Sequence, residues 1–145
     1  MNFKYFLNEL DKSVETTIQP KTKDELKKII EDTVKEQGYN CDLNFIDTSL
    51  IKDMRDMFAE SKFNGDISKW DVSNVENMST MFAKSKFNGD ISKWDVSNVK
   101  DMRYMFYKSN FNGDITKWDV SNVERMENMI CGSPLEGNEP DWYND

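Results

Sequence analysis

The chain contains no histidine among its 145 residues, and it has only two cysteines and three prolines. Histidine is the commonest general acid or base in enzymes. The sequence also shows no phosphate-binding loop, no pairing of a nucleophile with a base, and no cluster of residues with metal-ligand spacing. These absences argue against catalysis, and we expect a protein that is not an enzyme and that uses neither a cofactor nor a metal.

Long apolar runs are missing as well. No stretch approaches the roughly 20 apolar residues that a membrane helix needs. Residues 1–10 contain Lys4 and Glu9 where a signal peptide would have an uninterrupted apolar core. We therefore expect a cytoplasmic protein without a membrane segment, or an extracellular protein if a leader had been removed.

Basic residues are outnumbered, with 19 Lys and Arg against 27 Asp and Glu, which gives a net charge of −8. Binding to a phosphate backbone requires clustered basic side chains, so we expect no direct contact with nucleic acid. The acidity favours a protein partner with a basic surface, or it only keeps the chain soluble.

What the chain does contain is a repeated unit of 24 residues. The run FNGDISKWDVSNV begins at Phe63, returns unchanged at Phe87, and returns at Phe111 with one serine replaced by threonine. A degenerate unit begins at Tyr39, and a half-repeat that includes Trp142 follows the last unit. A fixed period of 20 to 50 residues predicts stacked units that contact only their neighbours.

The pattern inside each unit predicts its local structure. The alternation of Trp70 and Val72 about Asp71 predicts a short strand with the two apolar side chains inward. Met78 and Met81 have helical spacing and predict a helical wall opposite that strand. The sequence therefore predicts an α/β solenoid: a leucine-rich-repeat-like, right-handed coil of four units, each with a strand and a short helix, closed by an N-terminal helical cap and a C-terminal half-repeat cap.

These units resemble those of the BspA-like leucine-rich-repeat proteins of bacteria, from about Tyr39 to Trp142. The resemblance implies a protein that binds other proteins, often as an adhesin displayed on a cell surface, and it implies no catalytic residues. Export and anchoring segments, which such surface proteins carry, are not found in this sequence.

The two ends of the chain predict caps. We divide the chain into a helical cap at residues 1–38, the repeats at 39–134, and a C-terminal cap with an acidic tail at 135–145. Thr22 and Glu25 form a capping-box pattern that opens a helix, and Gly38 would end it. An earlier helix is predicted from an apolar stripe whose aromatic face would either dock on the repeats or mediate dimerisation: Phe3, Phe6, Leu7, Leu10 and Val14.

The two cysteines, Cys41 and Cys131, fall in the first and last repeats. Neighbouring strands lie about 5 Å apart. Several layers separate the two cysteines, so their Cα atoms are farther apart than the roughly 7 Å that a disulfide can bridge. We predict free thiols, which are typical of a reducing compartment.

Positions that differ between repeats are candidates for partner contacts. Arg103, Tyr104 and Tyr107, with Lys100 beside them, are selected because tyrosine and arginine dominate interface hot spots. The alternative is that the tyrosines only cover neighbouring methionines.

A ladder of aspartates is the second candidate surface, formed by Asp71, Asp95 and Asp119. These carboxylates could accept hydrogen bonds from nearby backbone and from serine hydroxyls, hold a cation, or contact a partner. Asn74, Asn98 and Asn122 are predicted to cap the chain before the helical wall.

The sequence therefore favours a monomeric, non-enzymatic protein–protein interaction module. Two alternatives stay open: a small acidic cytosolic inhibitor, encoded by a mobile element or phage, that covers a basic surface of a nucleic-acid enzyme, and a secreted relative of the adhesins. A structural unit that self-associates is a third class.

Overall fold

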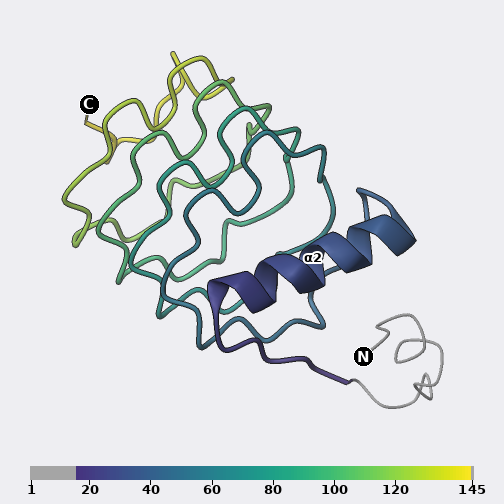
Figure 1. The fold of residues 1–145 in the computed structure, drawn as a ribbon. Coiled ribbons are helices and arrows are strands. Elements are labelled where there is room, and N and C mark those ends of the chain that lie inside the picture. The colour runs from purple at the N-terminus through teal and green to yellow at the C-terminus, as the bar shows by residue number, and fades with distance from the viewer. Residues whose placement is uncertain (1–15, 145) are drawn as a thin grey trace.

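The computed structural model describes residues 16–144 and contains one helix in that range, α2, at Lys23–Gln37 (Figure 1). No strand is formed among these residues, and strand-like pairing is limited to isolated parallel bridges such as Asp53 with Asn77. The prediction of a right-handed α/β solenoid with a strand and a helix in every unit is therefore wrong. The repeats are built from turns.

Successive repeats lie side by side, and we call them layers 1 to 4: residues 39–62, 63–86, 87–110 and 111–134 (Figure 1). Backbone hydrogen bonds join residues about one period apart. Between the layers, Phe58, Phe82 and Phe106 stack with ring centroids 5.6 Å apart at each step and with nearly parallel planes. The core consists of such columns of equivalent side chains.

The segment predicted as a helical wall forms turns because its backbone bonds to the next layer. We call residues 53–60 and their counterparts the wall. The Met57 N–H donates to the Met54 carbonyl three residues back, at 3.2 Å, whereas the Phe58 N–H donates across to Met81 of layer 2, at 2.8 Å. Asp56 and Glu60 have φ of 62° and 59°, in the left-handed region. A left-handed residue at every fourth position excludes a right-handed helix.

The short strand was predicted around Trp70 and Val72. We call residues 64–75, which include it, and their counterparts the Trp edge. Trp70 and Val72 are buried and Asp71 is exposed, as the alternation predicted. The backbone nevertheless turns twice, with Trp70 N–H donating to Ile67 and Val75 N–H donating to Val72. The indole joins the layers instead, because Trp70 Nε1 donates to the Leu43 carbonyl at 2.9 Å.

Gly65 opens the Trp edge for a steric reason. A Cβ atom at this position would lie 1.9 Å from the Cys41 carbonyl oxygen and 2.7 Å from the Phe63 ring. Its φ is not positive, so a left-handed backbone conformation is not what requires the glycine. The close approach of two layers requires it.

Helix α2 begins and ends where its sequence predicted. Thr22 Oγ1 accepts the Glu25 N–H at 3.1 Å, and the Glu25 carboxylate accepts the N–H of Lys21, one residue before the cap. Gly38 follows the helix with φ of 88°. Leu26 and Ile30 are buried against layer 1. The other predicted helix, Phe3 to Val14, lies outside the described residues.

The chain ends follow the same columns. Ile18, just before α2, exchanges backbone hydrogen bonds with layer 1 at Phe45 and Asp47. At the other end, the Trp142 indole donates to the Ile115 carbonyl at 3.0 Å, as Trp70 donates to Leu43. Cys41 and Cys131 are free thiols, as predicted. No helix within residues 16–144 is both long enough and apolar enough to cross a membrane.

Candidate functional site

The outer surface of the wall carries the side chains that differ between repeats. Backbone hydrogen bonds join its layers at every step, so the outward side chains can differ from layer to layer. In one column, Ala59 and Ala83 are followed by Tyr107 in layer 3. This exchange of a small side chain for a large one produces a hollow over the first two layers.

We call this hollow the tyrosine groove, and its volume is about 330 Å³. The two alanines form its floor. Tyr104 and Tyr107 line it from layer 3. The remaining lining residues are polar: Asp56, Glu60, Thr80 and Lys84.

The two tyrosines are held in place by their neighbours. Their rings meet edge to face, with centroids 5.4 Å apart and planes at 83°, an arrangement that aromatic pairs prefer. Lys108 Nζ lies 5.1 Å from the Tyr107 ring centroid, and Asn128 Nδ2 donates to the Tyr104 hydroxyl at 3.3 Å. Tyr104 remains 40% exposed. A fixed but accessible aromatic pair loses little entropy when it binds.

The polar rim of the groove is acidic in layer 1. Thr80 Oγ1 donates to the Asp56 carboxylate, which fixes that side chain beside the floor. Glu60 lies 3.9 Å from Lys84 Nζ, and both side chains are more than half exposed. Such an exposed ion pair is weak, so Glu60 can exchange its partner at little cost.

Two of the predicted contact residues do not line the groove. Arg103 forms a salt bridge with Asp101, in which the Arg103 Nη2 atom lies 2.7 Å from Asp101 Oδ2. Burial tends to raise the pKa of Asp101, but hydrogen bonds from Arg103 and the charges of Arg103 and Arg125 outweigh it and hold the pKa below its usual value. Lys100 lies 3.9 Å from Glu76 of the neighbouring layer. The structure thus brings together Tyr104 and Tyr107 and leaves Arg103 and Lys100 outside.

The aspartate ladder lies on the Trp edge and forms a separate surface. The Asp95 carboxylate accepts the Ser97 N–H at 3.0 Å and the Ser97 hydroxyl at 2.6 Å, which confirms the predicted hydrogen bonds. Asp71 and Asp119 do the same. The serine hydroxyl, then the serine backbone, lowers the pKa of Asp95 and of Asp119. Within residues 16–144 no three acidic or thiol side chains are grouped in a way that could hold a metal.

The capping role predicted for the repeated asparagines is wrong. Asn98 Nδ2 donates to the Ser73 carbonyl of the preceding layer at 2.6 Å, and Asn74 and Asn122 make the equivalent bond. These side chains hold layers together because no helix follows for them to cap.

Sequence reasoning missed the floor and the acidic rim of the groove. The signal was available, since the column that reads Ala59, Ala83 and Tyr107 is the place where the wall changes size from layer to layer. Small side chains at Ala59 and Ala83 make room beside the large side chain at Tyr107.

Residues 25–142 match the family model described as "Mycoplasma protein of unknown function, DUF285". The chain belongs to the DUF285 family. No match was found among curated proteins or among solved structures. In this DUF285 protein the matched residues include all four layers and most of α2.

Proposed function

We propose that this DUF285 protein is a non-enzymatic protein-interaction module that binds its partner through the tyrosine groove. One observation carries the proposal: two tyrosines held by neighbouring side chains line a hollow on a wall whose layers are joined by backbone hydrogen bonds. Tyrosine is among the residues that contribute most to interface affinity.

The chemistry of the groove favours a particular kind of segment. The alanine floor and the tyrosine rings suit one apolar side chain, and a volume of about 330 Å³ is at the low end of the roughly 300–1,000 Å³ range of binding pockets. Asp56 and Glu60 at the other end favour a lysine or arginine nearby in the partner. The net charge of −8 adds to this preference for a basic partner.

The likeness of the repeats to BspA-like units supports the same class of function. Those units imply binding to other proteins, and the turn-built layers seen here present variable side chains on one uniform scaffold. We propose that this protein shares with the BspA-like proteins both the repeat sequence and the binding of other proteins. The adhesin alternative would use the same groove outside the cell.

A second candidate function is inhibition of a nucleic-acid enzyme through its basic surface. It is favoured by two columns of exposed carboxylates along the Trp edge: Asp66, Asp90 and Asp114, and Asp71, Asp95 and Asp119. Lys69 and its counterparts lie between the two columns in the sequence, and their positive charges partly cancel the negative potential of the carboxylates. If this surface drives association, the rate should fall steeply as salt rises from low to physiological concentration.

Comparative affinity capture from a native lysate tests the groove. The full chain is used as bait beside a Tyr104→Ala, Tyr107→Ala double variant and beside Leu50→Ala, which removes an exposed apolar side chain elsewhere. A groove-bound partner is retained by the wild type and by Leu50→Ala, and it is reduced about tenfold or more by the double variant. Equal retention by the double variant would refute the groove and leave the aspartate surface to be tested by salt.

A further inference from the structure

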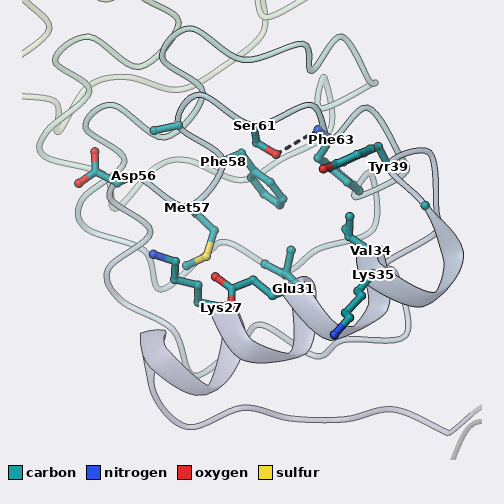
Figure 2. A pocket seen from close by; sticks show the side chains of 13 residues that line it. Lys27, Glu31, Val34, Lys35, Tyr39, Asp56, Met57, Phe58, Ser61 and Phe63 are labelled. Atoms are coloured by element: carbon teal, nitrogen blue, oxygen red, sulfur yellow. Dashed lines mark hydrogen bonds between the residues drawn. The ribbon is translucent and has the colours of Figure 1, made fainter. Parts of the chain in front are cut away.

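A second and larger hollow lies between α2 and the wall of layer 1, with a volume of about 670 Å³ (Figure 2). We call it the α2 groove. Ile30 and Val34 line it from the helix, and Met57 and Ala59 line it from the wall. Figure 2 shows Met57 directed toward the helix across this space. The groove separates α2 from this stretch of the wall and leaves room for a further segment beside it.

The backbone of the layer 1 wall lacks partners that every later layer has. In layer 2 the Met81 carbonyl accepts the Phe58 N–H, the carbonyl four residues earlier also accepts an N–H from layer 1, and layers 3 and 4 repeat the pattern. The equivalent carbonyls of layer 1 are those of Asp53 and Met57. They accept no backbone hydrogen bond from any residue between 16 and 144. The first layer thus ends in two unused acceptors on its wall.

The wall of layer 4 has unused donors at the matching positions, Met126 and Ile130. In layers 1 to 3 the N–H groups at these two positions donate to the next layer, but in layer 4 they donate to no residue between 16 and 144. Beyond them, the Gly132 N–H donates to Glu136 Oε2 at 2.7 Å. One end of the wall therefore offers donors at the spacing at which the other end offers acceptors.

The charged side chains of the two wall ends are also complementary. Within the stack, side chains one period apart come together, since Lys100 Nζ lies 3.9 Å from Glu76 Oε1 and Lys84 Nζ lies 3.9 Å from Glu60 Oε1. If layer 4 were followed by another layer 1, opposite charges would meet in three successive charged columns. The columns are Lys52 with Glu124, Asp53 with Arg125, and Arg55 with Glu127.

The Trp edge, in contrast, is closed at both ends by segments outside the repeats. Gln19 Nε2 donates to Asp47 Oδ2 of layer 1 at 2.9 Å, and the Trp142 indole donates to the Ile115 carbonyl of layer 4 at 3.0 Å. No such segment within residues 16–144 pairs with the open stretches of the wall. Unpaired backbone of this kind is where another chain can add.

The open end of layer 4 is apolar beneath its charges. Val123 and Met126 are only partly buried, whereas their counterparts in layers 2 and 3 are fully buried by the layer that follows. On the other end of the molecule, Ile30 and Val34 line the α2 groove and offer apolar side chains. Contact between the two ends would remove apolar surface from water on both sides.

We propose that the wall of layer 4 of one copy docks on the wall of layer 1 of a second copy, in the register in which the layers of one chain follow one another. The Met126 N–H then donates to the Asp53 carbonyl of the second copy. The Ile130 N–H donates to its Met57 carbonyl, beside the α2 groove. Because two different surfaces meet, the contact repeats from copy to copy and builds an open chain of molecules. Exposed ion pairs are weak, so the assembly depends on protein concentration and on salt.

Sedimentation equilibrium of the full chain at low salt tests this contact by exchanging charges. The average mass of the wild type should rise with concentration beyond that of a dimer. Glu127→Arg and Arg55→Glu each bring like charges together and should weaken self-association about fivefold or more. These two variants change the net charge in opposite directions, so an effect of net charge alone would not weaken both.

The double variant Glu127→Arg, Arg55→Glu is the matched control, because it keeps the wild-type net charge and brings opposite charges together with their signs exchanged. It should associate as the wild type does. An equimolar mixture of the two single variants should associate more strongly than either variant alone, because every contact between unlike copies pairs opposite charges.

Four outcomes would overturn the proposal: a wild type that stays monomeric at its highest soluble concentration, an association that stops at the dimer, single variants that associate as the wild type does, or a double variant that stays dissociated. None of these outcomes involves Tyr104 or Tyr107. The proposal therefore stands or falls apart from the proposed function, which uses the tyrosine groove.

Discussion

The Trp edge and the wall solve the same problem by different means. Both must hold successive layers in register at a fixed spacing. On the Trp edge of layers 2 to 4 side chains do this, because the indole of Trp94 and the amide of Asn98 each donate to a carbonyl of the preceding layer. Backbone hydrogen bonds join this edge between layers 1 and 2, where the Leu43 N–H donates to the Asp66 carbonyl. On the wall the backbone does it, through N–H groups such as that of Phe82 donating to Met105 of the next layer.

The difference explains which positions are free to vary. A side chain that bonds to the preceding layer must be repeated from layer to layer, and the Trp edge is nearly identical in layers 2, 3 and 4. Where the backbone makes the bond, the outward side chain is released, and the wall differs in every copy. Recognition is therefore expected on the wall, where the tyrosine groove lies.

The largest expected effect is on the free energy of unfolding, when an aromatic residue of the Trp edge is replaced by alanine. The comparison is with the same replacement at a wall aromatic of the same layer. Trp94 is 4% exposed and its Nε1 donates to Ile67, 3.1 Å away. Trp94→Ala should cost about 3–5 kcal/mol of unfolding free energy, because it leaves a cavity and an unpaired carbonyl. Tyr104→Ala, at a 40% exposed position, should cost less than about 1 kcal/mol. Urea denaturation measures both, and similar losses would contradict the comparison.

The next effect tests the dependence of the wall on its backbone. Lys84 has φ of 56°, and its side chain is largely exposed. Lys84→Val should cost about 1–2 kcal/mol, because a β-branched residue is strongly disfavoured in the left-handed region. Lys84→Gly should cost little.

Lys86→Val is the matched control, because Lys86 is exposed but has no positive φ. Thermal denaturation of the three variants gives the ranking. A loss in Lys86→Val as large as in Lys84→Val would show that valine itself, rather than the backbone conformation, is responsible.

The sequence could predict which residues share a column but not the backbone that joins them. Burial of Trp70 and Val72 and exposure of Asp71 follow from the repeat, and they are observed. The helix at Met78 and Met81 was wrong because a chain of three-residue turns gives the same apolar spacing as a helix. The turns need left-handed residues, and here these are Thr80 and Lys84 rather than glycine. In the column of Lys84, the last layer has Gly132, with φ of 74°. This glycine is the one residue of the column whose type indicates a left-handed conformation.

The tyrosine groove was predictable in part for a related reason. Tyr104 and Tyr107 were found because they differ from the other copies. Arg103 was selected on the same ground, but its salt bridge to Asp101 turns it away from the groove. Side-chain pairing within a turn cannot be read from spacing while the turn itself is unknown.

A smaller effect is expected from a single amide on the Trp edge. Asn98→Ala removes the hydrogen bond to the Ser73 carbonyl and should cost about 1 kcal/mol. Asn110→Ala is the control, since Asn110 is an exposed asparagine of the same layer that contributes only its backbone N–H to the stacking. A difference in unfolding midpoint between the two variants supports the structural role, and equal midpoints would assign the stacking to the backbone on both edges.

The smallest effect concerns one carboxylate of the aspartate ladder and appears as a pH dependence. The Ser97 hydroxyl, and then the Ser97 backbone, lower the pKa of Asp95, against burial and the charge of Asp119. Because the pKa is lower in the folded state, the stabilisation is complete above the unfolded pKa of about 4 and disappears as the pH falls through the folded value. Asp95→Asn should therefore melt below the wild type at about pH 6, and the two melting temperatures should converge by about pH 2–3. A gap that stays constant over this range would mean that the charge of Asp95 does not stabilise its turn, and the ladder would then be free to serve a partner.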